Sequence, residues 1–197
     1  GAENLKRQIE IVRSFGQPVI VALNRFAADT ENEISAIRDF CAAIDVAFSI
    51  SSHFAEGGKG AEDLARKVMD LAEEKSPPKF GYELTASLED KLRAVAQNIY
   101  GAAEISFSEA ARQKLAQLGN IDLPVCIAKT QYSFSTDPKA IGAPAGHTIE
   151  FSDIRLSAGA GFVVAVAGNM MTMPGLPRTP SAKDIGVDAS GAITGIN

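Results

Sequence analysis

The chain has 197 residues, of which 46% are hydrophobic and 22% are charged. This composition is typical of a globular protein with enough apolar material for one large domain or two small ones. The net charge of −5 disfavours non-specific binding to nucleic acid, and no apolar stretch is long enough to cross a membrane. Cys41 and Cys126 lie among apolar neighbours, so we expect buried free thiols in a reducing cytoplasm; a disulfide between them is the alternative.

The first 74 residues alternate between helical and strand patterns. The spacing of apolar residues predicts helices at residues 3–14, about 30–44 and 61–74, and short β-branched runs predict buried strands at 18–24 and 46–51. Thr30 and Glu33 have the spacing of a capping box, which marks the start of the second helix. The order strand, helix, strand, helix is typical of a right-handed parallel crossover.

A Pro-rich break at residues 76–78 separates this segment from a second one. There we expect helices at 88–100 and 108–118, strands at 124–128, 148–156 and 162–166, a long loop at 128–146 and a short hairpin near the end. The chain is therefore expected to be an α/β protein, with parallel-sheet βαβ layers that carry helices on their faces. The break divides it into residues 1–76 and a C-terminal α/β subdomain, residues 77–197.

Two aromatic residues occupy matched positions after the first two predicted strands. Phe26 follows the strand that ends at Asn24, and Phe54 follows the strand that ends near Ser51. Open α/β sheets bind ligands outside the carboxyl ends of their strands, and both strands would end at the same edge. Two phenyl rings there could sandwich a flat heterocycle. The alternative is that both rings cap the core beneath a loop.

Two loops are further candidates for ligand binding. Residues 56–60 (EGGKG) precede a helix, whose N–H groups could hold an anion or close over a ligand; the alternative is a flexible loop. The phosphate-loop pattern G-x-x-x-x-G-K-[ST] occurs nowhere in the chain. Lys129 and the hydroxyls of residues 130–135 could serve polar substrate groups, unless the loop is held by its own side-chain turns. The two histidines, His53 and His147, lack zinc-site spacing and are expected to be isolated, although His53 lies close enough to the second phenylalanine to contact a ligand.

Residues 155–180, RLSAGAGFVVAVAGNMMTMPGLPRTP, combine a Gly-rich turn, an apolar strand and a Pro-rich loop. The prolines fix φ and remove hydrogen-bond donors, so the loop is stiff and suggests a shaped binding edge. This segment resembles the C-terminal end of the formate–tetrahydrofolate ligases (10-formyltetrahydrofolate synthetases). Residues 19–31 (VIVALNRFAADTE) and 128–138 (AKTQYSFSTDP) resemble the same family, in the same order along the chain.

The resemblance implies an enzyme that uses ATP to join formate to tetrahydrofolate, through formyl phosphate, and gives 10-formyltetrahydrofolate. The chain would be the C-terminal part of this larger, P-loop-type enzyme, because its first ten residues resemble an interior stretch and its last five, ITGIN, a natural terminus. The phosphate loop and the formate-activating residues would lie upstream. We therefore expect no catalytic residue and no metal ligand in this chain, and no activity from it alone.

The resemblance also implies roles for individual residues. Phe26 and Phe54 would stack on the pterin ring of the folate, and Ala27 and Ile50 would line the same pocket. Some relatives carry Trp at the position of Phe54, and the smaller ring of Phe implies a weaker contact. Pro144 would flank the adenine of the nucleotide. A loop near the active-site cleft would consist of Met173, Pro174, Gly175, Leu176 and Pro177.

The cofactors implied by the resemblance are ATP with Mg²⁺ and a monovalent cation, with tetrahydrofolate as a substrate. The implied partners are the upstream part of the same enzyme and further copies of it in a tetramer, in the cytoplasm. The alternative function is a non-catalytic folate-binding or assembly module. An unrelated nucleotide-binding α/β domain is a third candidate, but it would need a phosphate motif that the chain lacks.

Overall fold

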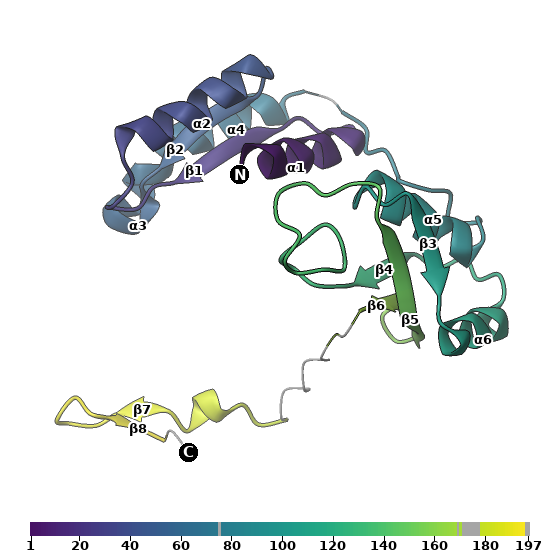
Figure 1. Cartoon of the computed structure of the whole chain (residues 1–197). Coiled ribbons are helices and arrows are strands. Elements are labelled where there is room, and N and C mark those ends of the chain that lie inside the picture. Colours follow the sequence, from purple (N-terminus) through teal and green to yellow (C-terminus); the bar gives the residue numbers. More distant parts are fainter. Residues whose placement is uncertain (75, 169, 171–177, 196–197) are drawn as a thin grey trace.

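The computed structural model describes residues 1–74, 76–168, 170 and 178–195 (Figure 1). Its first part alternates helices and strands, as the sequence predicts. The elements are α1 (Ala2–Ser14), β1 (Ile20–Asn24), α2 (Glu31–Ala43), β2 (Ala47–Ser51), α3 (His53–Glu56), the 3-10 helix η1 (Gly57–Ala61) and α4 (Glu62–Ala72). β1 and β2 form a parallel pair, in which Ile20 lies opposite Ala47 and Asn24 opposite Ser51.

The predicted capping box forms at the start of α2. The hydroxyl of Thr30 accepts from the N–H of Glu33 at 3.3 Å, and the Glu33 carboxylate accepts from the N–H of Thr30 at 2.9 Å.

Helices cover both faces of the first strand pair. On one face, residues of α1 and α2 pack against the strands in a cluster that includes Ile9, Cys41 and Phe48. Side chains alternate across a strand, so Ser49 points to the other face, where its hydroxyl donates to Asp63 of α4 at 2.6 Å. This is the arrangement expected of parallel strands.

A second sheet forms in the part of the chain after the Pro-rich break. Its elements are α5 (Leu88–Asn98), β3 (Glu104–Phe107), α6 (Glu109–Leu118), β4 (Val125–Ala128), β5 (Thr148–Ser157) and β6 (Phe162–Ala167). The strand order is β3-β5-β6-β4. β3 and β5 are parallel, as are β4 and β6, but β5 and β6 are antiparallel.

The expectation of parallel-sheet layers is therefore confirmed only in part for this sheet, because β5 and β6 are antiparallel. The reason is the short connection between β5 and β6, in which the carbonyl of Ser157 accepts from the N–H groups of Ala160 and Gly161. Such a turn can join only antiparallel neighbours, because a parallel crossover needs a dozen or more residues. β3 was also not among the predicted strands.

The two cysteines differ in burial. Cys41 is fully buried and Cys126 is exposed, and both thiols are free. α5 and α6 cover the face of the sheet to which Ile127 of β4 points, and Ile127 belongs to the core cluster there. Cys126 is the preceding residue of the same edge strand, so it points away from that core. The prediction that Cys126 is buried is wrong for this reason.

α5 also carries a lysine without exposed surface. Lys91 Nζ donates to the carbonyl oxygens of Ile121 at 2.9 Å and Leu123 at 3.2 Å. Both carbonyls belong to the connection between α6 and β4. A buried ammonium requires such partners, so Lys91 fastens this connection to the helix.

The end of the described chain contains the 3-10 helix η2 (Ser181–Lys183) and an antiparallel pair, β7 (Gly186–Val187) and β8 (Ile193–Thr194). The expected short hairpin is thereby confirmed. Its turn is held by the carboxylate of Asp188, which accepts from the N–H groups of Ser190 at 2.8 Å and Ala192 at 3.0 Å. Within the ranges that the structure describes, no helix is both long and apolar enough to cross a membrane.

Candidate functional site

The parallel strands β1 and β2 end at the same edge of the sheet, where α3 follows β2 (Figure 1). Phe26 lies two residues after β1, and Phe54 lies within α3. Beyond the last paired residues of the two strands, the N–H of Arg25 donates to the carbonyl of Ser51 at 3.0 Å. The two segments that follow β1 and β2 are therefore still side by side at this point. Phe26 follows directly and is 60% exposed, while Phe54, three residues after β2, is 87% exposed. Neither ring caps the core of this chain.

A closed four-residue turn carries Phe26. The N–H of Phe26 donates to a carboxylate oxygen of Asp29 at 2.8 Å, and the N–H of Asp29 donates back to the carbonyl of Phe26 at 3.1 Å. Arg25 lies at the start of this turn and forms a 3.0 Å ion pair with Glu31 at the start of α2. The turn is thus held at both ends, by β1 and by α2.

The segment that carries Phe54 is closed where it meets β2. The N–H of Ser52 donates to the carbonyl of Gly60 at 2.9 Å, which joins the start of α3 to η1. A Cβ atom at Gly60 would lie only 2.5 Å from the carbonyl carbon of Ser52, so only glycine fits there. Gly57 has φ +60° and ψ −145°, a conformation that is essentially restricted to glycine. Gly58, in contrast, has open space around it.

The other residues predicted for this site lie close to the two phenylalanines in the chain. Ala27 is exposed in the turn after Phe26. Ile50 is half-buried within β2, opposite Leu23. His53 is exposed, and its Nδ1 lies 3.0 Å from the hydroxyl of Ser51.

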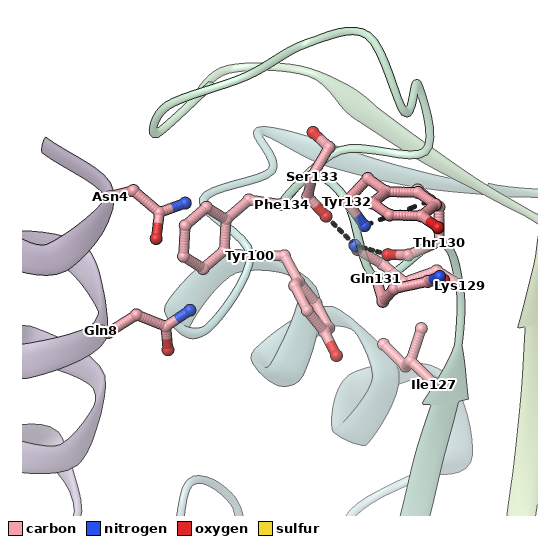
Figure 2. Close-up of a pocket in the computed structure, with 10 residues that line it drawn as sticks. All are labelled: Asn4, Gln8, Tyr100, Ile127, Lys129, Thr130, Gln131, Tyr132, Ser133 and Phe134. Carbon is pink, nitrogen blue, oxygen red and sulfur yellow. Dashed lines mark hydrogen bonds between the residues drawn. The ribbon is translucent and has the colours of Figure 1, made fainter. Parts of the chain in front are cut away.

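A cavity of about 290 Å³ lies between α1 and the loop after β4 (Figure 2). Asn4 and Gln8 project into it from α1, toward Phe134 and Tyr100 (Figure 2). Lys129 lines the cavity as well. Its Nζ lies 4.7 Å from the centre of the Tyr100 ring. Lys129 and residues 130–135 were candidates from the sequence, but the contribution of α1 to this cavity was not predicted, because α1 is remote from the loop along the chain.

Internal hydrogen bonds hold the loop after β4. Lys129 Nζ donates to the carbonyl of Thr130 at 2.9 Å and to that of Ser133, and burial lowers the pKa of Lys129. The hydroxyls of Ser133 and Ser135 are 2.9 Å apart, and the Ser135 hydroxyl accepts from the N–H of Asp137 at 3.1 Å. The sequence left two interpretations of this segment: a loop tied by its own side chains, or hydroxyls that serve a substrate. The observed hydrogen bonds fit the first interpretation better, because they lie within the loop.

Pro144 lines a second cavity, of about 210 Å³. Small residues form its wall beside Pro144, and four charged residues of α1 form the rest: Gly101, Ala143 and Ala145, and Glu3, Lys6, Arg7 and Glu10. Arg7 donates to the carbonyl of Asn98 at 2.9 Å, which fixes the guanidinium at the rim. Pro144 was a candidate from the sequence, whereas the position of α1 beside it was not predicted.

His147 lies at the end of the same loop. Within the described ranges neither ring nitrogen has a hydrogen-bond partner. Burial, and to a smaller extent the charge of Lys129, lowers the pKa of His147. The backbone of Phe134 acts in the opposite direction, although it is not at hydrogen-bond geometry.

The predicted cleft loop, residues 173–177, lies outside the described residues. In the part of the chain that the structure covers, no three His, Cys, Asp or Glu side chains group as a metal site.

Comparison with known proteins decides the family. The family model described as formate–tetrahydrofolate ligase matches residues 1–197. The chain belongs to this family. It is 54% identical over 202 residues to the formate–tetrahydrofolate ligase of Methylobacterium sp. (strain 4-46), 52% to that of Methylobacterium nodulans, and 50% over 201 residues to that of Hyphomonas neptunium. Each match covers 100% of this chain but 36% of the relative, so the chain spans about a third of these ligases.

The family predicted from three sequence blocks is therefore confirmed. The roles of Asp29 and Gly60 in supporting the aromatic edge were not predicted from the sequence. The only local signal for Asp29 is its residue type, because Asp is one of the residues whose side chains hydrogen-bond to nearby backbone in turns. The need for glycine at position 60 depends on its contact with Ser52 and has no local signal.

Proposed function

We propose that this chain is the pterin-binding part of a larger ligase that uses ATP to join formate to tetrahydrofolate, giving 10-formyltetrahydrofolate through formyl phosphate. Membership of the family supports this proposal, as does the coverage of 36% of the relatives' length. The observation that carries it is the pair of phenyl rings, 60% and 87% exposed, at the carboxyl edge of two parallel strands.

In this proposal Phe26 and Phe54 hold the flat pterin ring, with Ala27 and Ile50 beside them. Each ring exposes apolar surface to water in the free chain, and a planar ligand would remove that surface from water and add stacking. The role of the clamp is positioning. It would hold the folate so that its amine attacks the formyl carbon of formyl phosphate as the bond to phosphate breaks, and holding the amine there removes translational freedom before the reaction.

Pro144 contributes a flat wall for the adenine in this proposal. Gly101 and Ala145 leave room beside the proline ring, and the charged residues of α1 that line the cavity, Glu3, Lys6, Arg7 and Glu10, balance in charge, so the apolar wall rather than a net charge supports the adenine role. The chain has no phosphate-loop pattern, so the ATP phosphates would bind to the remaining part of a P-loop-type enzyme. The described residues contain no group of three His, Cys, Asp or Glu side chains that could hold a metal ion, and we assign them no part in holding magnesium.

The resemblance alone supports the remaining parts of the proposal. Residues 1–76 would be the folate-clamp segment and residues 77–197 the C-terminal subdomain, with the loop 173–177 near the cleft. The complete enzyme would be a cytoplasmic tetramer, and a monovalent cation would take part.

Substitution of the two rings in the complete enzyme tests the proposal. Phe54→Ala and Phe26→Ala should each raise the KM for tetrahydrofolate by about two- to tenfold, because stacking contributes about 0.5–1.5 kcal/mol. Phe54→Trp should keep or lower that KM, since it presents a larger ring. Phe80→Ala is the matched control, because Phe80 is 86% exposed but lies between the two parts of the chain. A normal folate KM in both alanine variants would refute the clamp.

The second candidate is a non-catalytic folate-binding or assembly module. The face of the second sheet that carries Cys126 favours it, because this face is not covered by α5 or α6. Equilibrium titration of the purified chain with tetrahydrofolate, beside an assay of ATP turnover with formate, separates the candidates. Turnover by the chain alone would contradict both, whereas folate binding without turnover, together with normal kinetics of the ring variants, would favour the module.

A further inference from the structure

We propose that Asp29 is a positioning residue for tetrahydrofolate, which acts by holding the backbone of Phe26. This inference rests on the proposed function, because it assigns Asp29 to the same ring clamp. Asp29 does not need to touch the ligand in this role. The orientation of Phe26 would depend on the carboxylate of Asp29.

Packing cannot orient Phe26, since 60% of this residue is exposed. Its direction must therefore come from the backbone that carries it. Two hydrogen bonds close that backbone into a turn, one from the Phe26 N–H to the Asp29 carboxylate at 2.8 Å and one from the Asp29 N–H to the Phe26 carbonyl at 3.1 Å. A hydrogen bond to an ionised acceptor is about twice as strong as a neutral one.

Asp29 is itself held on a rigid support. The next residue, Thr30, is the N-cap of α2 and is fixed by three hydrogen bonds with Glu33. Asp29 is half-buried, in contrast to the exposed residues 24–28 before it. The carboxylate thus links the start of a helix to the backbone of an exposed ring.

The neighbouring charges do not compete for this carboxylate. Arg25 forms its ion pair with Glu31, at 3.0 Å, and its N–H donates to Ser51. The Asp29 carboxylate is therefore available to accept the hydrogen bond from the Phe26 N–H that closes the turn. Without it, the turn would keep only the bond between the Asp29 N–H and the Phe26 carbonyl, which any residue at position 29 except proline could form.

A purely structural role is the competing explanation. An acid just before an N-cap also stabilises a helix through its dipole, and that effect would lower stability without changing folate binding specifically. The two explanations differ in their coupling to Phe26. A positioning residue has nothing left to position once the ring is removed, whereas a structural effect would persist in the absence of the ring.

The test is a double-mutant cycle in the complete enzyme, with initial rates at varied tetrahydrofolate, ATP and formate, and thermal unfolding of each variant. Asp29→Ala should raise the folate KM about fivefold, the equivalent of one hydrogen bond, and leave the KM values for ATP and formate unchanged. Asp29→Asn should restore most of the folate KM, because its amide oxygen still accepts from the Phe26 N–H. Asp29→Ala combined with Phe26→Ala should match Phe26→Ala alone. Glu31→Gln, which breaks the adjacent ion pair, is the control and should leave the folate KM unchanged.

Additive effects of Asp29→Ala and Phe26→Ala on the folate KM would overturn the positioning role. So would an unchanged folate KM in Asp29→Ala when Phe26→Ala raises it. A normal KM in Phe26→Ala itself would refute the ring clamp, and the positioning role would fall with it, so failure of the proposed function is distinguishable from failure of this inference.

Discussion

Gly60 offers a sharp test of how the segment with Phe54 is held, through the variant Gly60→Ala. The added Cβ would lie 2.5 Å from the carbonyl carbon of Ser52, 2.6 Å from its oxygen and 2.9 Å from the nitrogen of His53. All three atoms belong to the backbone, so no side-chain rotation can relieve the contact. Ordinary contact begins at 3.4 Å, and the difference from 2.5 Å means that the two segments must separate by 0.9 Å.

This separation would break the hydrogen bond from Ser52 to Gly60, which is 2.9 Å long, and carry Phe54 with it. The lost bond costs about 1 kcal/mol of stability. A displacement of about 1 Å near a reacting group can reduce the rate a hundredfold, so we expect kcat/KM for tetrahydrofolate to fall by about ten- to a hundredfold.

The assay is the initial rate of the complete enzyme at varied folate concentration, with thermal unfolding measured in parallel. Gly81→Ala is the control, because Gly81 has an ordinary φ and no atom within 4 Å of an added Cβ. If Gly60→Ala retains the folate kinetics of Gly81→Ala, the contact at Ser52 does not position Phe54 and the reasoning is refuted.

Two further predictions concern stability. Lys91→Met should lower the free energy of unfolding by about 2–4 kcal/mol in urea titrations, because it leaves the half-buried carbonyls of Ile121 and Leu123 without the donor that the fully buried Lys91 supplies. Arg93→Met on the same helix, which removes only a part-exposed ion pair with Glu89, should cost about 0.5 kcal/mol or less, and equal effects of the two variants would contradict the role of Lys91. The pKa of His147 is lowered in the folded chain, so below its ordinary value of 6.5 the unfolded chain binds the extra proton and stability should fall as the pH decreases. His147→Asn should weaken this dependence in urea titrations at pH 7.5 and 5.5 (about one unit on either side of the ordinary value); an unchanged dependence would contradict it.

Local signals in the sequence predicted the first part of the fold well. The capping box of Thr30 and Glu33 set the start of α2, and the β-branched run before Asn24 gave β1. Both depend on neighbours within a few residues. β3 escaped prediction because its four residues are too few for a clear alternation, and because its partner, Thr148 and the residues after it, lies more than forty positions later.

The candidate site divides in the same way. The positions of Phe26 and Phe54 after two strands were sufficient to predict that they share an edge, since parallel strands end together. The contact that holds Phe54 was not predictable, because Gly60 is required only by the approach of Ser52. The charged residues of α1 beside Pro144 are separated from it by most of the chain, and Cys126 is exposed because it lies on the open face of an edge strand.

The unequal burial of the two cysteines turns them into two independent chemical reporters. A thiol reagent added to the native chain should react with Cys126 at once, and burial both shields Cys41 and raises its pKa, which keeps it in the unreactive thiol form. Because Cys41 belongs to the cluster under β1 and β2, its rate of labelling measures how often that cluster opens. The rate at which the part with the aromatic edge opens can therefore be measured from the labelling of Cys41, independently of the second sheet. This measurement needs no engineered cysteine.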